Sequence, residues 1–259
     1  MVSQYTTEDI PPELDALPVT AYGSISLTSA AGLFDNIAVF SNTTYHTSTP
    51  MNMEYYSQNY GLILYSIQLA ASQTAANNDI SFPGYICDRV QVFLNNAHQG
   101  TIYRPDASQS LNNLKTDAGS QPRLDLLVEN MGRLNYGQAM TDKKGIINGV
   151  LWNGGLLQGG SNDWTVTSMG LTTAQMQALS YLSIDESTPT NRATSGIISP
   201  YFYKGYLTLT DTPTDTYIHM NKWTKGYVWV NQKLLGRYWE TMGPQVSFKL
   251  SSYDVIPTL

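Results

Sequence analysis

Charged side chains are scarce in this sequence: they make up 13% of its 259 residues, against roughly 25% in an average soluble domain. The longest basic run is Lys143-Lys144, so the chain lacks the clustered positive charge that nucleic-acid binding requires. No apolar run approaches the ~20 residues of a membrane-spanning helix. Uncharged polar residues replace the missing charges, which favours a β protein with large contacts or one that faces sugars.

Cysteine is almost absent, since Cys87 is the only one. An internal disulfide is therefore impossible, and the redox compartment is left open. The residues before Pro18 are acidic and contain no apolar core, so they do not form a signal peptide. One glycosylation triplet, Asn42-Thr43-Thr44, is only a weak indication of secretion. The localisation is therefore unknown from these residues.

Helical periodicity is missing from nearly all of the chain. Only Leu171–Leu182 fits a helical face, with Thr172 or Thr173 as its N-cap. A barrel of eight βα units takes about 250 residues. The length would allow such a barrel, but a single helical segment excludes it.

Short alternating segments fill the chain instead, punctuated by Gly and Asn. They are Tyr22–Thr28, Gly61–Leu69, Val90–Leu94, Leu124–Val128, Gly145–Trp152, Trp164–Val166, Tyr201–Leu209, Thr216–Met220, Tyr227–Val230 and Val246–Leu250. Short strands spaced in this way predict a sandwich or barrel.

Two of the predicted hairpins look alike. Their turns are Asn95-Asn96 and Asn231-Gln232, and glycine follows each turn, at Gly100 and Gly236. This similarity is a weak indication of two related sandwiches. Two-residue hairpin turns need positive φ, which Asn tolerates better than Gln. We therefore expect a longer or bulged loop at Gln232.

Three segments resemble family 35 glycoside hydrolases, the β-galactosidases. The first is Asp215–Gln245, in which the matching residues are Trp223, Lys225, Gly226, Leu235, Gly236, Arg237, Tyr238, Trp239, Gly243, Pro244 and Gln245. The second is Leu124–Gly137, which matches at Glu129, Asn130, Gly132, Arg133, Asn135, Tyr136 and Gly137. The third joins Tyr60–Tyr65 to Asp88-Arg89-Val90. In family order these segments cover roughly residues 20–250.

The resemblance implies an all-β fold of two jelly-roll, galactose-binding-like β-sandwich domains with one short helix between them. We expect a lead-in and linker with one strand over 1–52, the first sandwich over 53–168, a helix and linker over 169–200, and the second sandwich over 201–259.

The second sandwich is expected to lack its last strand and to borrow Trp164–Val166. Its open edge would be covered either by Tyr22–Thr28 folding back or by a strand added from another chain.

No catalytic residue is expected. The family's two catalytic glutamates lie on barrel strands, and retaining glycosidases hold such carboxyl groups about 5–5.5 Å apart. None of the chain's glutamates lies in a segment that resembles the barrel motifs. Glu54, in Met53–Tyr56, superficially resembles a nucleophile motif but precedes the first sandwich strand. His46, His98 and His219 lack metal-ligand spacing, so we expect neither a metal nor a cofactor.

Four residues are candidates for binding. The resemblance implies that Arg133 and Tyr136 face the mouth of the barrel or a partner. The alternative is a purely structural role, in which Glu129 and Arg133 form an ion pair and Asn130 fixes a turn. Trp223 and Trp239 are candidates for stacking on galactose.

The tryptophans could instead have structural roles. Trp229 alternates within a strand and is expected in the core, and Trp239 is expected to stack on Arg237.

Three functions remain open at this point. The chain is an ancillary part of a β-galactosidase, a stand-alone structural subunit of a larger assembly, or a carbohydrate-binding module. Its partners would be a catalytic barrel chain, other protein subunits or a galactose-type carbohydrate. The family resemblance implies a lysosomal or secreted parent, although this chain shows no signal peptide.

Overall fold

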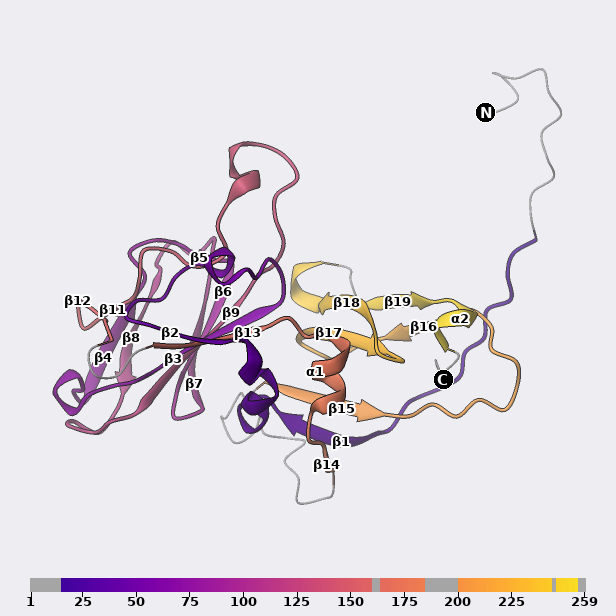
Figure 1. Ribbon diagram of the computed structural model, residues 1–259. Helices are drawn as coiled ribbons and strands as arrows, with labels where there is room; N and C mark the ends of the chain where they lie inside the picture. The colour runs from indigo at the N-terminus through magenta and orange to yellow at the C-terminus, as the bar shows by residue number, and fades with distance from the viewer. Residues whose placement is uncertain (1–14, 160–163, 185–199, 244–245, 256–259) are drawn as a thin grey trace. The chain divides into compact units, whose positions relative to one another are not determined.

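The computed structural model describes residues 15–159, 164–184, 200–243 and 246–255. The chain forms two compact units, and strands dominate both (Figure 1). The larger unit spans Leu27–Gly205, and the smaller unit joins the chain up to Ser26 to the chain from Tyr206 onward. The predicted all-β fold class is confirmed. Among the described residues, no helix is long and apolar enough to cross a membrane.

Two antiparallel sheets face each other in the larger unit. The six-stranded sheet has the order β2 (Thr44–Thr47), β13 (Trp164–Met169), β3 (Leu62–Gln68), β9 (Arg123–Glu129), β6 (Arg89–Leu94) and β7 (Ala97–Tyr103). The four-stranded sheet has the order β12 (Gly155–Leu156), β11 (Leu151–Trp152), β4 (Asn77–Ser81) and β8 (Ser110–Lys115).

Smaller elements complete this unit. The strands are β5 (Ile86–Cys87) paired with β10 (Gly145–Ile146), and a three-stranded sheet of β14 (Leu182–Ser183), β1 (Leu27–Gly32) and β15 (Tyr201–Gly205). The 3₁₀ helices are η2 (Phe34–Thr43), η3 (Met53–Tyr56), η4 (Ala71–Gln73) and η5 (Gln138–Thr141).

The core of the larger unit lies between its two main sheets. Alternate residues of each strand point inward, as the period of two requires. The six-stranded sheet contributes Ile63, Tyr65, Ile67, Val90, Val92, Leu94, Leu124, Leu126 and Val128, and the four-stranded sheet contributes Ile80, Leu114 and Trp152. Each fully buried apolar side chain of this size contributes roughly 1.5–3 kcal/mol.

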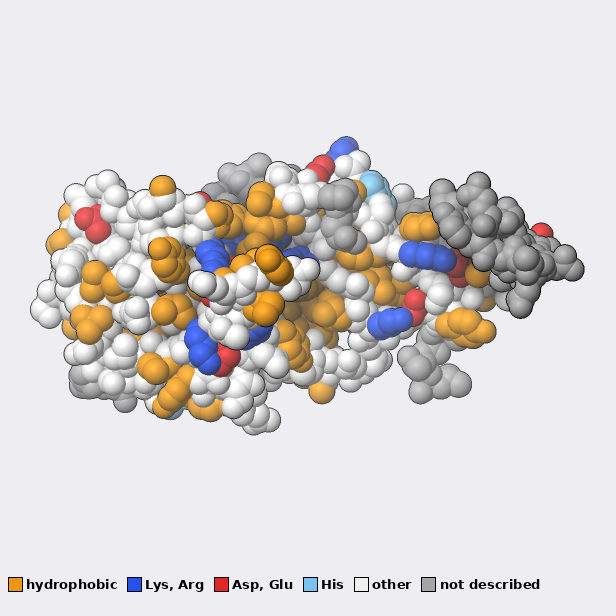
Figure 2. All heavy atoms as spheres, turned by 90° about the horizontal axis from the view of Figure 1, so that it is seen from above, with side chains coloured by type: hydrophobic (Ala, Val, Ile, Leu, Met, Phe, Trp, Pro, Cys, Tyr) orange, Lys and Arg blue, Asp and Glu red, His pale blue; other side chains and the backbone are white. Residues whose placement is uncertain are grey.

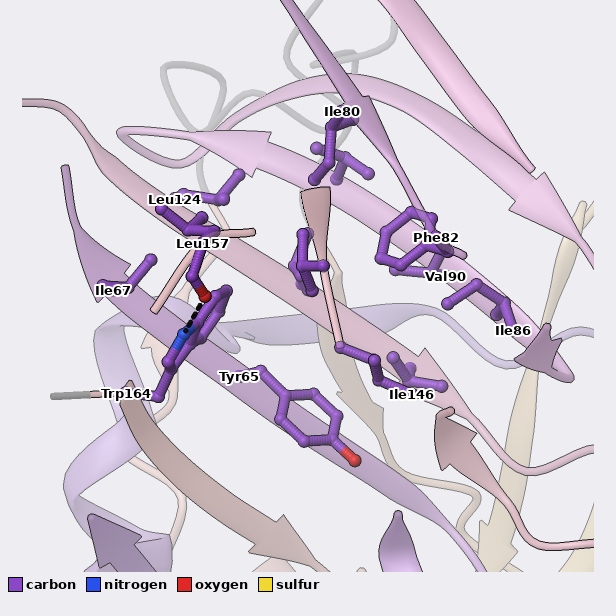
Figure 3. Packing of buried hydrophobic residues seen from close by; sticks show 14 of the residues in the cluster. Tyr65, Ile67, Ile80, Phe82, Ile86, Val90, Leu124, Ile146, Leu157 and Trp164 are labelled. Atoms are coloured by element: carbon purple, nitrogen blue, oxygen red, sulfur yellow. Dashed lines mark hydrogen bonds between the residues drawn. The ribbon is translucent and has the colours of Figure 1, made fainter. Parts of the chain in front are cut away.

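Polar atoms within this core are paired. Figure 3 shows Trp164 packed among the core side chains, where its indole Nε1 donates a hydrogen bond to the Leu157 carbonyl at 3.2 Å. The hydroxyl of Tyr65 donates to the Met51 carbonyl at 2.8 Å. Burial raises the pKa of Tyr65 well above its ordinary value, so this hydroxyl keeps its proton and remains a donor.

The smaller unit contains two two-stranded sheets. They are β16 (Thr216–His219) with β19 (Ser247–Leu250), and β17 (Lys225–Val230) with β18 (Lys233–Trp239). Its short helical turns are η7 (Glu240–Met242) and α2 (Ser252–Val255). Only Val228, Tyr238 and Phe248 form a buried cluster among its described residues, with Trp223 and other partly buried side chains packed against it.

The N-terminal segment folds back onto the smaller unit, although with a different span from the predicted Tyr22–Thr28. Val19 forms a parallel bridge with Asp215. The Thr20 amide donates to the Asp215 carbonyl at 3.0 Å, and the Thr216 hydroxyl donates to the Thr20 carbonyl at 2.7 Å. The strand itself starts later, as β1, and pairs with β15 inside the larger unit.

Two expectations about single elements need correction. Trp164–Val166 does not belong to the second sandwich, because β13 lies between β2 and β3 in the larger unit. The predicted helix over Leu171–Leu182 is only α1 (Thr173–Ala178). Leu171 has a left-handed φ of 52° and Leu179 has an extended backbone, so both lie outside the helix. The cap at Thr172 is confirmed, since its hydroxyl accepts from the Gln175 amide.

The longer or bulged loop expected at Gln232 is not found at that position. Val230 pairs directly with Lys233, so the turn has two residues, and both Asn231 and Gln232 have positive φ, of 45° and 71°. The irregularity lies within the hairpin instead, as a register shift between Val228 and Trp229.

Candidate interaction loop and its ionic base

A projecting loop, residues 131–143, joins β9 to β10. It stands clear of the sheets of the larger unit and carries η5 (Figure 1). Its exposed apolar side chains are Leu134, at 54% exposure, Tyr136, at 88%, and Met140, at 47%. Figure 2 views this face from above, with hydrophobic side chains and Lys or Arg side chains close together at its centre. The loop therefore combines an apolar tip with charged surroundings.

The first anchor of the loop is the buried carboxylate of Asp88. Both of its oxygens accept from the Lys144 ammonium, each at 2.8 Å, and one also accepts from the Met131 amide at 2.8 Å. Lys144 is 1% exposed. Removing one member of such a buried pair costs roughly 3–5 kcal/mol, because the other charge is left without compensation.

The second anchor is the carboxylate of Glu54, which is only partly buried. Its two oxygens accept from the Lys144 backbone amide, at 3.1 and 3.0 Å, and one oxygen also accepts from the Arg133 guanidinium. Glu54 lies in η3, whose N-cap Asn52 accepts from the Tyr55 amide. The short helix thereby directs the carboxylate at the base of the loop.

Arg104 connects the loop to the first anchor. Its guanidinium lies 3.4 Å from an Asp88 oxygen and forms an ion pair with Asp142, within the loop. Cys87 is buried beside this group, and burial raises the pKa of its thiol. The thiol therefore favours its protonated form, which is the less nucleophilic one.

The Glu129–Arg133 ion pair expected from the sequence is wrong. Arg133 reaches Glu54, and Glu129 pairs with Arg89 at 3.5 Å. The extended strand β9 ends at Glu129, so the two side chains do not share a helical face four residues apart. The expected turn at Asn130 is confirmed, because its side-chain oxygen accepts from the Gly132 amide at 2.9 Å.

Arg133 and Tyr136 therefore lie on the same loop, one at its base and the other at its tip. Arg133 lies at the base, where its guanidinium also donates to the Asn59 carbonyl at 3.2 Å. Tyr136 lies at the exposed tip. That either residue faces a barrel or a partner stays a prediction.

Asp88 and Lys144 were not selected from the sequence. The available signal was a charged residue directly before a buried strand at each position, since β6 follows Asp88 and β10 follows Lys144. A charge at the start of an interior strand requires a partner.

The tryptophan candidates lie in the smaller unit. Trp223 packs against the buried cluster of Val228, Tyr238 and Phe248. The ring of Trp239 has the Lys225 ammonium 4.9 Å from its centroid. A role for either ring in stacking on galactose stays a prediction, as does the stack of Trp239 on Arg237.

The expected core position of Trp229 is not found. Trp229 is only partly buried, and the neighbouring Val228, on the opposite face of the strand, is the buried residue. Among the described residues, no three His, Cys, Asp or Glu side chains gather into a group that could hold a metal ion.

Comparison with known families assigns both parts of the chain. Residues 50–170 match the family model described as the first all-beta domain of beta-galactosidase. Residues 200–252 match the model described as the galactose-binding domain of beta-galactosidase. The chain belongs to the β-galactosidase family, of which it carries the first all-beta domain and the galactose-binding domain. The resemblance seen in the sequence is thus confirmed, and the projecting loop lies within the first of these two domains.

Individual relatives support the same family assignment. The chain is 32% identical to beta-galactosidase of Mus musculus over 249 residues, which are 91% of the chain and 36% of the relative. It is 33% identical to beta-galactosidase of Xanthomonas manihotis, with 93% of the chain and 36% of the relative covered. Beta-galactosidase-1-like protein 3 of Rattus norvegicus is 29% identical over 93% of the chain and 36% of the relative. The chain spans about a third of the length of these β-galactosidase relatives.

Proposed function

We propose that this chain is the non-catalytic β-sandwich region of a family 35 β-galactosidase-like protein, and that loop 131–143 contacts the catalytic barrel. The observation that carries the proposal is the pair of matches to the all-β domains of β-galactosidase, which together account for most of the chain. The projecting loop supplies the surface for such a contact.

The chemistry of the loop suits protein contact. Tyrosine is one of the residue types enriched among those that dominate the binding energy of interfaces, when it enters a desolvated pocket. Leu134, Tyr136 and Met140 lie within one short segment and are exposed. The ionic anchors at both ends fix the segment before contact, so less conformational entropy is lost on binding.

The catalytic part of the proposal is tested with the chain alone. Pure recombinant chain is expected to leave a chromogenic β-galactoside unhydrolysed, because its glutamates do not fall in barrel motifs and Glu54 is engaged by Lys144 and Arg133. Hydrolysis that Glu54→Ala abolishes would overturn the proposal.

The partner is identified from the native complex, by its gel-filtration mass and by the chains that co-purify. A chain that bears a barrel supports the proposal. Many unrelated subunits would replace it with a stand-alone structural subunit that has lost the enzyme. A monomer retained on galactose resin would replace it with a carbohydrate-binding module.

The role of the loop is tested with the double variant Leu134→Ser, Tyr136→Ser. We expect it to weaken binding of the barrel chain at least tenfold, since truncating a tyrosine that acts as an interface hot spot costs about 2 kcal/mol or more. Tyr253→Ser is the matched control, because Tyr253 is 84% exposed and belongs to the smaller unit. Equal binding by both variants would place the contact elsewhere.

A further inference from the structure

The two ends of loop 131–143 meet at the same two carboxylates. Asp88 accepts from the Met131 amide at the start of the loop and from the Lys144 side chain just past its end. Glu54 accepts from the Arg133 guanidinium near the start and from the Lys144 backbone amide at the end. Each carboxylate therefore bridges both ends, and Lys144 lies between them.

We propose that Glu54 and Asp88 form a two-carboxylate clamp, in which Glu54 is the positioning residue that holds loop 131–143 in its contact conformation. The partner named for this loop rests on the proposed function. The clamp itself rests on the hydrogen bonds of the larger unit.

The two carboxylates differ in burial, which divides their roles. The Asp88 side chain is 8% exposed and faces the nearly inaccessible Lys144 ammonium, so its loss would unbalance a buried charge. The Glu54 side chain is 20% exposed and faces Arg133, which is 34% exposed. Water can therefore replace part of what Glu54 provides. Loss of Glu54 would release the loop while the sandwich stays folded.

Two further hydrogen bonds lie within the loop. The Met140 amide donates to the Gly137 carbonyl at 3.4 Å, and the Asp142 amide donates to the Ala139 carbonyl at 3.2 Å. Both belong to the single turn of η5 and neither connects the two ends. A further ionic contact of the loop is that of Asp142 with Arg104, which also lies beside Asp88 at the base. The conformation of the tip thus depends on how firmly the ends are held.

Hydrogen exchange on the full chain tests the clamp without any partner. In Glu54→Ala the Lys144 amide loses its acceptor, and we expect its exchange to rise at least tenfold. The Met131 amide, held by Asp88, is expected to change less, and the amides of β3 and β9 are expected to stay protected. Glu54→Gln, which keeps one carbonyl acceptor but no charge, is expected to fall between wild type and alanine.

The matched control is Glu240→Ala, at an exposed glutamate of the smaller unit. Exchange at Lys144 within twofold of wild type in Glu54→Ala would overturn the clamp. Increased exchange across β3 and β9 together with the loop would also overturn it, because Glu54 would then support the whole sandwich and not the loop.

Binding of the barrel chain to Glu54→Ala separates this inference from the proposed function. A loosened loop with weakened binding supports both. A loosened loop with unchanged binding supports the clamp and removes the loop from the proposed contact. An unchanged loop overturns the clamp and leaves the family-based proposal as it was.

Discussion

The β6–β7 hairpin of the larger unit and the β17–β18 hairpin of the smaller unit follow the same plan. Both turns have two residues of positive φ, Asn95-Asn96 and Asn231-Gln232. Both hairpins shift register at the same distance before the turn, between Val92 and Phe93 in one and between Val228 and Trp229 in the other. The two hairpins, which are similar in sequence, therefore also share the same backbone geometry.

A glycine on the second strand completes the correspondence. Gly100 pairs with Val92 and Gly236 pairs with Val228. A Cβ on Gly100 would lie 2.7 Å from the Leu111 side chain of β8, and one on Gly236 would lie 2.9 Å from the Phe248 ring of β19. In both units glycine lets a strand of another sheet approach closely, which is a recognised reason for glycine within strands.

Burial separates the two hairpins. Phe93 is fully buried in the larger unit, whereas Trp229, at the equivalent position, is only partly buried. Local sequence thus determines the conformation of the turn and the register shift, and it supplies the glycine on the second strand. What packs against the hairpin decides how deeply its side chains are buried: Phe93 has the ring of Phe34, from η2, at 5.0 Å between centroids.

The largest effect is expected at Gly236, where backbone strain and a clash with a ring add together. Gly236→Val should destabilise the smaller unit strongly, because Gly236 has a φ of 153°, which side-chain-bearing residues rarely adopt, and faces a rigid ring. The backbone strain alone costs about 1–3 kcal/mol. Gly100→Val should cost less, since its φ is not in that region and it meets the movable end of Leu111. Calorimetry of both variants checks the order, and equal losses would contradict the assigned role of φ.

Truncation of the equivalent aromatic residues should come next. Phe93→Ala is expected to cost about 3–5 kcal/mol, as for a fully buried ring, and its contact with Phe34 at 5.0 Å between ring centroids is lost as well. Trp229→Ala should cost clearly less, despite the larger side chain, because Trp229 is only partly buried. Urea unfolding of each variant measures the difference. A larger loss of unfolding free energy in Trp229→Ala would indicate that Trp229 lies in the core, as the sequence predicted.

Substitutions in the two turns should instead raise the stability of the folded protein. Gln232→Gly is expected to stabilise the smaller unit by about 0.5–1 kcal/mol, because glycine adopts the φ of 71° without strain. Asn96→Gly, at a φ of 66°, should gain less, since Asn already tolerates this region. Shifts in melting temperature read both. Two equal gains would mean that the strain is not specific to glutamine.

The smallest effect is expected from pH. Burial is the main reason that the pKa of His98 lies below its ordinary 6.5, with the Arg89 charge adding to it. The unfolded chain therefore binds this proton more readily, and folding stability should fall as the pH drops through 6.5. Leucine stands at the equivalent position 234, so His98→Leu should flatten this part of the pH profile. A profile that keeps its slope would assign it to another group.

About half of the described strands could be predicted because alternation is local, whereas others, such as β4 and β8, have no segment predicted for them. Val90–Leu94 and Tyr227–Val230 both lie within strands of the structure. The partners of a strand could not be predicted in the same way. Trp164–Val166 was expected in the second sandwich, yet β13 lies between β2 and β3, because pairing is decided by residues more than a hundred positions away.

The candidate site was predicted in part. The family motif identified Arg133 and Tyr136, and both lie on the projecting loop. The ion pairs at its base were missed, because Glu54 and Asp88 approach Lys144 only after β5 and η3 are placed. Glu129 was expected as the partner of Arg133, but Glu129 pairs with Arg89 and Arg133 pairs with Glu54.

The chain path through the two units has a consequence for the order of folding. Val19 pairs with Asp215, so the smaller unit is closed by residues that stand on either side of the whole larger unit in the sequence. During synthesis the larger unit is complete before the ribosome delivers β16 to β19. Since domains generally fold as units from the N-terminus, residues 19–22 would wait without a partner while the larger unit is synthesised. By closing its own ends through β1 and β15, the folded larger unit would bring this waiting segment near the late strands and reduce a long-range search to a short one.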